Sequence, residues 1–569
     1  MAHYLYMDVT NEPSGKKSNF IQDLIDEDLK SSRFTTHVQT RFPPEPNGFL
    51  HAGHAKAICL NFGIARGYSG LFNLRFDDTN PVTENSEYVF SIRKDLEWLL
   101  GEELESDPLY TSDYFEQLYL WAELLIKDGK AYVDDQGAET ISIQRGSFQE
   151  VGVDSPFRNR TPEENLLIFR EMRSGAFAEG HCVLRAKIAM DHVNMNMRDP
   201  VMYRIRNERH FRTGDTWCIY PTYDWAHGQS DALEGVTHSL CTLEFDSHRE
   251  LYDWFLDQLD IPSERRPYQT EFARLNFTHT VLSKRVLKRL VDDSVVEGWD
   301  DPRMPTLSGF RKRGYPASAI RSFCDHIGAA KTNGTHEIEL LESFVRSELN
   351  QNADRKLAVI RPLKLTITNW PPEHIEMLTA MNNPEDPSAG SREIPFCGSL
   401  YIEHNDFMEN PEPKYYRLSP GREVRLRYGY YITCNKVLKD EAGNPIELLC
   451  TYDPETSGGK SPDGRKVKAT IHWVSANHAI EGKVALYERL FAVEHPGSES
   501  GDPLDDINQS SKTLLTNAMF EPSIAEATYG DVIQFERLGF FNLDQNDPIL
   551  FHRTVGLRDE WANIVKRRK

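Results

Sequence analysis

The chain has 569 residues with 39% hydrophobic and 27% charged residues, a composition typical of a globular protein of roughly three to five structural units. No apolar run approaches the ~18 residues of a membrane helix, which excludes a membrane-spanning class, and eight dispersed cysteines without a CxxC pair indicate reduced thiols and exclude a zinc module. The net charge of −22 argues by itself against nucleic acid, so any basic contact surface must be local.

The first predicted elements form a single supersecondary unit. Residues 1–20 contain neither a signal peptide nor a transit peptide pattern, so we expect a cytoplasmic protein. Helical apolar spacing over 18–34 predicts a leading helix. A strand over 36–42, a Pro-rich loop, a helix over 50–68 and a strand over 71–78 then predict a βαβ unit and a parallel sheet.

Similar strand and helix patterns return further along the chain. The blocks 216–245 and 268–293 repeat the same order, so we assign them to the same parallel sheet. Residues 109–215 have helices and a strand of their own and predict a domain inserted into that sheet. The pattern is helical over 290–349. From residue 350 its period changes to two, which predicts β structure large enough for two barrels.

The predicted domain boundaries follow these changes of pattern. They are 1–36 for an N-terminal extension, 37–108 with 216–289 for the parallel-sheet domain, 109–215 for the insertion, 290–349 for a helical connecting domain and 350–569 for two β-barrels. The predicted fold class is therefore multidomain α/β plus β.

One stretch has the composition of a phosphate site. Residues 43–48 contain three prolines and an Asn-Gly pair, so a rigid loop leads into the helix. His51 and His54 share one face of the first turn, where backbone N–H groups also lie free, and Gly53 lets a ligand approach the backbone. The alternative is a pair of surface histidines. A metal pair is disfavoured because no third ligand is near.

A second candidate is Lys284 in "VLSKR", where a strand pattern ends and a helix pattern begins. A lysine in a basic stretch is usually a solvated charge. The position of this loop in the chain favours a function. An HxGH motif in the first βαβ unit and an LSK loop after the last such unit together fit ATP bound at the carboxyl ends of parallel strands.

These motifs resemble those of a known family. "PPEPNGFLHAGH" is similar to the HIGH signature and "VLSKR" to the KMSKS signature of class I aminoacyl-tRNA synthetases. "NLRFDDTNP", "YPTYDWAHGQSDALEGVTHSLCTLEF", "EGWDDPRMPT" and "RTVGLRD" extend the resemblance to the glutamyl/glutaminyl subgroup over most of the chain. The resemblance implies a Rossmann-like catalytic domain with an inserted acceptor-end-binding domain, a helical domain and two anticodon-binding β-barrels.

The resemblance also implies an ATP site, with Mg²⁺ arriving with ATP and no metal ligands in the protein. His51, His54 and Lys284 would be the catalytic residues, stabilising charge at the phosphates. The implied ATP-binding residues are Glu45, Pro46, Asn47, His51, Ala52, Gly53, His54, Ala55, Lys56, Ala57, Thr242, Arg274, Leu275, Leu282, Ser283 and Lys284.

Four residues would bind the amino acid. By resemblance, Asp77 holds the substrate ammonium and Arg41 meets its carboxylate, while Tyr223 and Gln269 read a side-chain amide. Each has a structural alternative: Asp77 and Asp78 cap the following turn, Arg41 pairs with Asp77, or Tyr223 is a core aromatic residue with a bonded hydroxyl.

Other residues would contact tRNA. Phe148 matches an apolar side chain that helps to open the terminal base pair of the acceptor end, and its alternative is a buried core residue. Arg425 and Arg427 share one strand face opposite Val424 and Leu426, which suits anticodon phosphates, unless they form a solvated ladder. Further anticodon-reading positions by resemblance are Asn350, Arg355, Arg417, Gln534 and Arg537.

Some positions depart from the family pattern. Ala52 replaces an isoleucine, Leu282 a methionine and Arg285 the last serine of the two signatures, but both histidines and the lysine remain, so we expect activity. Tyr416 and Ser247 stand where the family has a basic and an acidic tRNA-contacting residue.

The implied function is ATP-dependent activation of glutamine to its adenylate and transfer to tRNA(Gln), by a monomer without membrane attachment. The alternatives are an enzyme of the same subgroup specific for glutamate, and a non-catalytic tRNA-binding relative. Physical reasoning separates glutamine from glutamate only through the cation that a carboxylate would require nearby.

Overall fold

The computed structural model describes residues 18–34, 37–104 and 106–568, so the predicted extension 1–36 is described only at 18–34. The chain divides into two compact units, one reaching to Leu275 with Cys324–Gly334 added, the other comprising Asn276–Phe323 and Thr335–Lys569. Across the described ranges, no helix is both long and apolar enough to cross a membrane.

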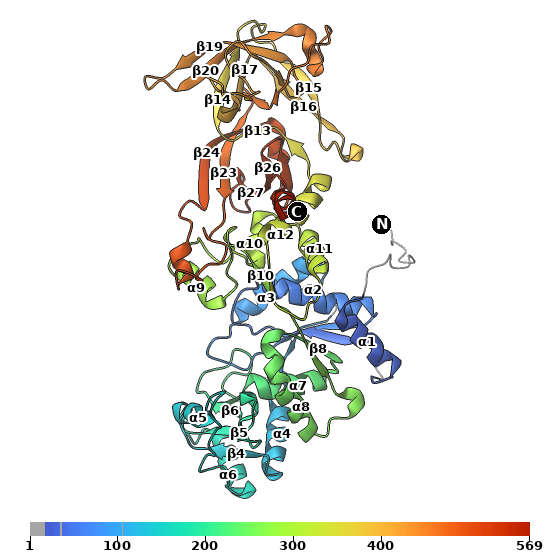
Figure 1. The fold of residues 1–569 in the computed structure, drawn as a ribbon, viewed down its shortest axis with the longest axis vertical. Helices are drawn as coiled ribbons and strands as arrows, with labels where there is room; N and C mark the ends of the chain where they lie inside the picture. Colours follow the sequence, from blue (N-terminus) through green and yellow to red (C-terminus); the bar gives the residue numbers. More distant parts are fainter. Residues whose placement is uncertain (1–17, 35–36, 105, 569) are drawn as a thin grey trace. The chain divides into compact units, whose positions relative to one another are not determined.

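The first unit contains the predicted parallel sheet (Figure 1). Strands β1 and β2 pair in parallel with Arg41 opposite Asn73, and β2 pairs in parallel with β3, which confirms the predicted βαβ unit. Strand β8 pairs in parallel with β9, and Thr237 N donates to Gln39 O at 3.0 Å, so β8 follows β1 on its other side. The elements are α1 (Phe20–Lys30), β1 (Gln39–Phe42), α2 (Ala52–Gly67), β2 (Leu71–Phe76), α3 (Ser86–Leu100), β3 (Leu109–Tyr110), α7 (Tyr223–Glu234), β8 (His238–Thr242), α8 (Arg249–Gln258) and β9 (Tyr268–Phe272).

This order places a topological switch point between β1 and β8. Strands β2 and β3 follow on one side of β1 and strands β8 and β9 on the other, so the chain direction across the sheet reverses there. Ligands of doubly wound sheets bind outside the carboxyl ends of the strands at such a point.

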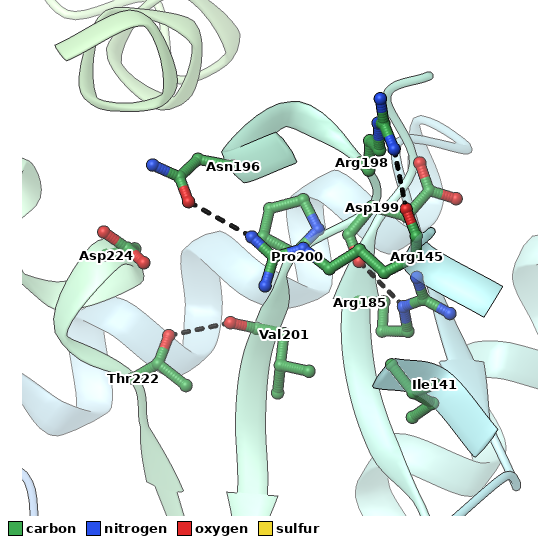
Figure 2. Close-up of a pocket in the computed structure, with 10 residues that line it drawn as sticks. All are labelled: Ile141, Arg145, Arg185, Asn196, Arg198, Asp199, Pro200, Val201, Thr222 and Asp224. Atoms are coloured by element: carbon green, nitrogen blue, oxygen red, sulfur yellow. Dashed lines mark hydrogen bonds between the residues drawn. The ribbon is translucent and has the colours of Figure 1, made fainter. Parts of the chain in front are cut away.

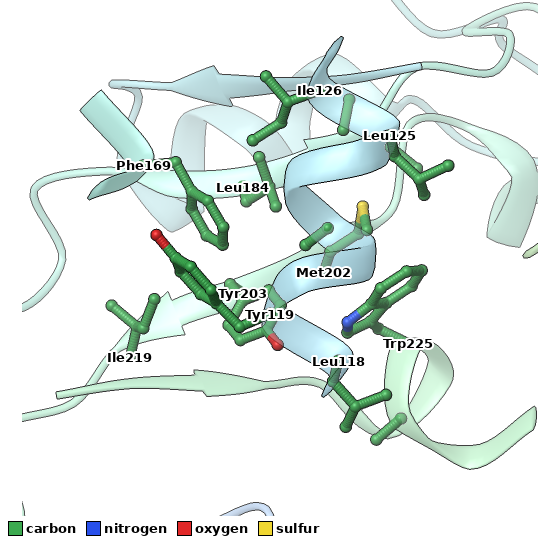
Figure 3. Packing of buried hydrophobic residues seen from close by; sticks show 14 of the residues in the cluster. Leu118, Tyr119, Leu125, Ile126, Phe169, Leu184, Met202, Tyr203, Ile219 and Trp225 are labelled. Carbon is green, nitrogen blue, oxygen red and sulfur yellow. The ribbon is translucent and has the colours of Figure 1, made fainter. Parts of the chain in front are cut away.

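The inserted region forms an antiparallel sheet of its own. Its strands are β4 (Ala131–Asp134), β5 (Val183–Ala186), β6 (Val201–Ile205) and β7 (Ile219–Pro221), in that order. Its helices are α4 (Phe115–Lys127), α5 (Ala138–Arg145) and α6 (Pro162–Arg173). Helix α6 begins with a Thr161/Glu164 capping box and Pro162 at its first position. Tyr119 of α4 stacks on Phe169 of α6 at 4.8 Å within the core shown in Figure 3.

The prediction that block 216–245 belongs to the parallel sheet is wrong for the first strand of that block, β7. Strand β7 pairs antiparallel with β6, with Tyr203 opposite Pro221, and closes the sheet of the insertion. A short apolar run before a helix predicts a strand but does not reveal its pairing partner, because the partner is remote in sequence. Helix α7 therefore joins the two sheets: it follows the last strand of one and precedes β8 of the other.

The second unit begins with short helices and strands. They include β10 (Leu275–Phe277), α9 (Lys284–Asp292), α10 (Leu307–Arg313), α11 (Ala317–Ile327), β11 (Gly334–His336) and α12 (Ile338–Asn352), and the last described helix is α13 (Glu560–Arg568). Leu275 of β10, the end of α11 and the first residue of β11 belong to the first unit. Helices α10 to α12 confirm the predicted helical pattern over 290–349. Leu287 and Leu290 of α9 belong to a core cluster with Leu490 and Phe491.

Two seven-stranded sheets confirm the predicted β-barrels. One sheet ends in β21 and β22, separated only by His472, and the other ends in β12 and β13, separated only by Leu357. Because both end strands belong to one extended segment, each sheet curls back on itself. The first consists of β21 (Thr470–Ile471), β18 (Glu423–Leu426), β19 (Tyr431–Lys439), β20 (Pro445–Asp453), β14 (Pro362–Ile367), β17 (Ser399–Glu403) and β22 (Trp473–Ser475). The second consists of β12 (Arg355–Lys356), β25 (Val532–Phe535), β26 (Gly539–Leu543), β27 (Leu550–Gly556), β23 (Ile480–Tyr487), β24 (Lys512–Phe520) and β13 (Ala358–Val359), and a separate hairpin pairs β15 (Glu376–Met381) with β16 (Ser391–Phe396).

Candidate active site

Two histidines form the first turn of α2. His51 is the N-cap residue, and its Nδ1 accepts a hydrogen bond from Gly53 N at 3.1 Å. His54 Nδ1 accepts from His51 N, also at 3.1 Å, so the two imidazoles complete a capping box. Their ring centroids are 3.9 Å apart.

This capping determines what the rings can donate. Because each Nδ1 accepts a hydrogen bond, the proton of the neutral imidazole belongs on Nε2. Burial, together with His54, lowers the pKa of His51 well below its usual value, so His51 is a neutral donor. The turn thus combines imidazole N–H groups with the positive end of the helix dipole, which suits a phosphate.

The loop before α2 carries the predicted ATP-binding residues Glu45, Pro46 and Asn47. Two backbone hydrogen bonds of 3.0 Å fix it: Asp77 N donates to Pro44 O, and Asn85 N donates to Pro46 O. The loop is therefore attached both to the end of β2 and to the start of α3.

Lys56 has a different role from the predicted direct contact with ATP. Its side chain is buried, and Nζ donates to Ala273 O at 2.7 Å, directly before Arg274 and Leu275. The ammonium thus ties α2 to the chain that follows β9. The small side chains of Ala52 and Ala55 are buried, Ala57 packs against a core cluster, and Thr242 ends β8.

Leu282, Ser283 and Lys284 belong to the second unit. Ser283 is the N-cap of α9 and Lys284 its first residue, with an exposed side chain and no acidic residue in the first turn. A cation at this end of a helix opposes the helix dipole unless an anion lies there too. Their part in the ATP site stays a prediction.

Asp77 lies directly after β2, at the carboxyl end of the sheet. It is 2% exposed, and among the described residues neither carboxylate oxygen has a hydrogen-bond donor of normal geometry. Burial raises the pKa of Asp77 to about 7, against the lowering effect of Arg75. Buried polar groups are nearly always paired, so this carboxylate is suited to a cationic ligand group.

Asp78 does not cap the following turn, as the alternative had it, but binds a turn 34 residues further along the chain. Its oxygens accept hydrogen bonds from Ser112 N at 2.8 Å and Ser112 Oγ at 2.6 Å, within the 3₁₀ turn Thr111–Tyr114. The two neighbouring aspartates therefore differ: Asp78 is hydrogen-bonded within the fold, whereas the carboxylate of Asp77 has no such hydrogen bond among the described residues.

Tyr223 and Gln269 lie close together around Phe245. The Tyr223 ring stacks on His227 at 4.7 Å and lies 5.1 Å from Phe245. Gln269 donates from Nε2 to Phe245 O at 3.1 Å and to Glu271 Oε1 at 3.0 Å, which leaves its Oε1 as an acceptor. Within the described chain the Tyr223 hydroxyl has no hydrogen bond, so the alternative of a core tyrosine with a bonded hydroxyl does not hold.

Arg41 is fully buried. Its Nε donates to Asp231 Oδ1 at 3.0 Å and its Nη1 to Leu240 O at 3.0 Å, while Nη2 donates to Ser239 Oγ at 2.7 Å. The alternative pairing with Asp77 is wrong, because Asp231 is the ionic partner. A substrate carboxylate would have to share this guanidinium with Asp231.

The sequence interpretation missed Asp231, His227 and Arg75. Asp231 and Arg75 are completely buried and form an ion pair of 2.7 Å. The signal was present: Tyr223, His227 and Asp231 are spaced by four residues on α7 and share one helix face. Polar residues recurring at that interval within a buried helix indicate a site or an ion network.

The insertion contains a pocket of about 210 Å³ (Figure 2). Arg145 reaches across it, donating from Nη2 to Asn196 Oδ1 at 3.1 Å and from Nε to Met195 O at 3.0 Å. Thr222 and Asp224 also line it, on either side of Tyr223 at the start of α7. One strand–helix junction thus serves both this pocket and the proposed amide site.

The loop after α5 presents Phe148. Arg198 Nη1 donates to the carbonyl oxygens of Arg145, Ser147 and Glu150 at 2.8–2.9 Å and holds the loop from within. Phe148 is 87% exposed, so the alternative of a core phenylalanine is wrong.

Three family models match the chain. The model described as tRNA synthetases class I (E and Q), catalytic domain, covers residues 37–351, and two models for the anti-codon binding domain cover 353–453 and 470–544. The chain belongs to the class I tRNA synthetases of the E and Q type.

Relatives of this synthetase share most of its length. Glutamine–tRNA ligase of Nitrobacter winogradskyi is 54% identical over 96% of this chain and 97% of its own. The corresponding enzyme of Rhodopirellula baltica is 56% identical over 97% and 91%, and that of Citrobacter koseri 53% identical over 97% and 99%.

In the β region of the synthetase, three predicted anticodon residues form one cluster. Arg355 on β12 donates from Nε to Gln534 Oε1 at 3.1 Å and from Nη2 to Asn350 Oδ1 at 3.3 Å. Arg355 and Gln534 are register partners in the parallel pair of β12 and β25. All three side chains are thereby held in fixed orientations.

Two further predicted arginines share one buried carboxylate. Arg417 and Arg537 approach Asp406 Oδ1 at 3.1 and 2.9 Å, and Arg537 Nη1 also lies 2.8 Å from His472 Nδ1. Arg537 has φ +68°, a left-handed conformation that is strained for a residue with a side chain. Such strain concentrates at functional positions.

Arg425 on β18 and Arg427 directly after it confirm the predicted alternation. Val424 and Leu426 are buried, whereas Arg425 and Arg427 on the opposite face are partly exposed. Arg427 donates to Glu536 Oε2 at 2.7 Å, so it is a positioned side chain rather than a solvated one.

Proposed function

We propose that this synthetase is a glutamine–tRNA ligase that activates glutamine with ATP and transfers the glutaminyl group to the 3′-terminal adenosine of tRNA(Gln). The observation that carries the proposal is 53–56% identity to glutamine–tRNA ligases over nearly the whole of both chains. A monomeric, cytoplasmic enzyme is part of this proposal.

The pocket residues supply complementary groups for free glutamine. The unpaired carboxylate of Asp77 receives the α-ammonium group. The Tyr223 hydroxyl and Gln269 Oε1 meet the side-chain amide, and Arg41 meets the α-carboxylate. None of these residues forms a covalent bond with the substrate.

The activation step is a phosphoryl transfer. A carboxylate oxygen of glutamine attacks the α-phosphorus of ATP, the bond from that phosphorus to the β-phosphate oxygen breaks, and pyrophosphate leaves. His51 and His54 donate from Nε2 to phosphate oxygens, and Lys284 stabilises the charge that builds there. The terminal ribose hydroxyl of tRNA then attacks the acyl carbon and AMP leaves.

Magnesium enters this proposal bound to ATP. In the described ranges no group of three or more His, Cys, Asp or Glu residues is arranged to hold a metal ion. The phosphates themselves are the oxygen ligands that Mg²⁺ prefers, and the ion supplies charge neutralisation for the leaving pyrophosphate.

The tRNA contacts extend from the insertion to the β region. Arg145 and its pocket, with exposed Phe148 beside it, suit the unpaired acceptor end. The arginine clusters of the β region suit anticodon bases and phosphates, which overcomes the acidic net charge locally. Bound tRNA would order the site before activation, an induced-fit form of specificity.

Aminoacylation of total tRNA with labelled glutamine, and in parallel with labelled glutamate, tests the proposal. We expect charging with glutamine only. Charging with glutamate would leave the ATP site in place but transfer the assignment to the glutamate enzymes of the subgroup. No charging and no pyrophosphate exchange in the presence of tRNA would favour a non-catalytic tRNA-binding protein.

The ionisation of Asp77 predicts an acid limb in the pH profile. Because burial raises its pKa to about 7, the carboxyl group is protonated and unable to bind an ammonium group at lower pH. The value of kcat/KM for glutamine is expected to fall roughly tenfold per pH unit below that pKa and to level off above it. Aminoacylation from pH 5.5 to 8.5 measures this. An acid limb that persists unchanged in Asp77→Asn would assign it to another group.

Replacing Phe148 by alanine separates stability from tRNA recognition. Because the ring is 87% exposed, the melting temperature should not change, whereas kcat/KM for tRNA should fall roughly tenfold if the ring stacks on a base. Leu120→Ala, an exposed apolar site on α4 at 50% exposure, is the control and should alter neither quantity. Equal tRNA kinetics for both variants would remove Phe148 from the contact surface.

A further inference from the structure

A short segment directly after β9, residues 273–275, is held from two sides within the first unit. Ala273 N donates to Ala330 O at 2.8 Å, and Ala273 O accepts a hydrogen bond from Lys56 Nζ of α2 at 2.7 Å. Both polar backbone groups of Ala273 are therefore taken up by other parts of that unit. The segment lies between α2 on one side and the loop that contains Ala330 on the other.

The next residue of the segment, Arg274, is fixed in the same way. Its backbone N donates to Asn333 Oδ1 at 3.0 Å, and Asn333 belongs to the same loop as Ala330. The Arg274 side chain forms an ion pair with Glu244, in the 3₁₀ turn Leu243–His248 that follows β8. Because β8 and β9 are parallel, the segment thus lies beside the end of β8 at the carboxyl edge of the sheet.

The Lys56 ammonium group is costly to bury. Lys56 is 4% exposed, and among the described residues the Ala273 carbonyl is its hydrogen-bond partner and no carboxylate forms an ion pair with it. Burial lowers the pKa of Lys56, which reflects the cost of a buried charge without an ionic partner. An apolar side chain of similar length would fill the same space without that cost. Packing alone therefore does not account for Lys56, whereas its hydrogen bond to the segment does.

Lys56 also lies on the helix whose first turn suits phosphates. His51 and His54 belong to that turn, and Lys56 follows His54 by two residues on α2. With a rise of about 1.5 Å per residue, the Cα atoms of His51 and Lys56 are separated by roughly 7–8 Å along the helix axis. A nucleotide with its phosphates at the first turn extends along the carboxyl edge of the sheet, where residues 273–275 also lie. Lys56 thus fixes the distance between the phosphate-binding turn and this segment.

We propose that Lys56 and Asn333 are positioning residues for ATP, which hold residues 273–275 against α2 so that the segment binds the nucleoside part of ATP while His51 and His54 bind its phosphates. This inference rests on the proposed ATP-dependent function. Neither residue touches ATP in this account; they act through the Ala273 carbonyl and the Arg274 N–H. Loss of either bond should weaken ATP binding equally in the ground state and the transition state, which raises KM for ATP and leaves kcat nearly unchanged.

Lys56→Met tests this with the KM for ATP, measured by pyrophosphate exchange at saturating tRNA and glutamine. The KM for ATP should rise roughly tenfold, the equivalent of one lost hydrogen bond, while kcat and the KM for glutamine stay within about threefold of wild type. Lys56→Arg keeps a cationic donor and should restore the KM for ATP to within about threefold of wild type. Lys356→Met is the matched control, because Lys356 is a buried lysine of β12 in the second unit. It should leave the KM for ATP unchanged.

Asn333→Ala carries the test if Lys56→Met does not fold, because Asn333 is exposed. It should raise the KM for ATP about threefold. Asn369→Ala is its control: Asn369 Oδ1 accepts from Tyr452 N at 3.0 Å, a bond of the same kind in the second unit, and its loss should leave the KM for ATP unchanged.

Two results would overturn the inference. One is a KM for ATP equal to that of the wild type in Asn333→Ala and in any folded Lys56→Met protein. The other is a fall in kcat accompanied by an equal rise in the KM values for ATP and glutamine, which is the result expected of a merely structural role. A wild-type enzyme without any pyrophosphate exchange would instead overturn the proposed function itself, before any variant is compared.

Discussion

Replacing Asp77 by asparagine is expected to lower kcat/KM for glutamine by about 10²- to 10³-fold without weakening the fold. The substrate ammonium loses its only proposed carboxylate partner, and the loss of one member of a buried charge pair typically has this magnitude. The fold loses little, because neither Asp77 oxygen accepts a hydrogen bond of normal geometry from the part of the chain that the structure describes. Steady-state aminoacylation and thermal unfolding of the same preparation measure the two effects.

The pH dependence of stability sharpens this test. Burial raises the folded-state pKa of Asp77 to about 7, so its ionisation disfavours the folded state progressively as pH rises from about 4 to 7. Asparagine removes that penalty, and the melting temperature of the variant should equal or exceed that of the wild type at pH 8 and approach it near pH 4. Asp78→Asn is the control: burial raises the pKa of Asp78 to about 7 as well, but Asp78 also accepts two hydrogen bonds from Ser112, so this variant should melt at a lower temperature than Asp77→Asn. An Asp77→Asn enzyme that keeps its kcat/KM would contradict the assignment.

The local elements of the catalytic domain could be predicted because they depend on nearby residues. The βαβ unit follows from the apolar period on either side of the Pro-rich loop, and the alternation at Arg425 and Arg427 follows from the period of a strand. The histidine positions also followed from spacing. The sequence does not show that each imidazole accepts a backbone hydrogen bond through Nδ1, because capping geometry depends on side-chain rotation.

Partnerships between distant residues could not be predicted. Arg41 and Asp231 are 190 positions apart, and nothing local distinguishes Asp231 from other acids as the partner of Arg41. Strand β7 shows the same limit. Its apolar run is compatible with either sheet, and only its pairing with β6 shows that it belongs to the sheet of the insertion. The domain boundaries remain predictions, although β7 indicates that the insertion continues past residue 215.

Replacing His51 by asparagine is expected to separate helix capping from catalysis. Asparagine is among the best N-cap residues, and its Oδ1 can accept from Gly53 N as His51 Nδ1 does, so the melting temperature should stay close to that of the wild type. The variant lacks the Nε2 donor, however, and loss of one preorganised donor at a developing charge lowers kcat by about 10²- to 10³-fold. Pyrophosphate exchange in the presence of tRNA reports this step directly.

His51→Ala completes the comparison, because it removes both functions. Its free energy of unfolding should fall by about 1 kcal/mol, and its kcat should fall by the same factor as that of His51→Asn. If His51→Asn keeps full activity while His51→Ala loses it, His51 only organises the turn, and the phosphate contact passes to His54 and the backbone N–H groups. If both variants lose kcat equally while only His51→Ala melts earlier, the imidazole of His51 is a donor to ATP in its own right. That outcome would explain why this helix opens with histidine, a weaker capping residue than serine or asparagine, at the carboxyl edge of the parallel sheet.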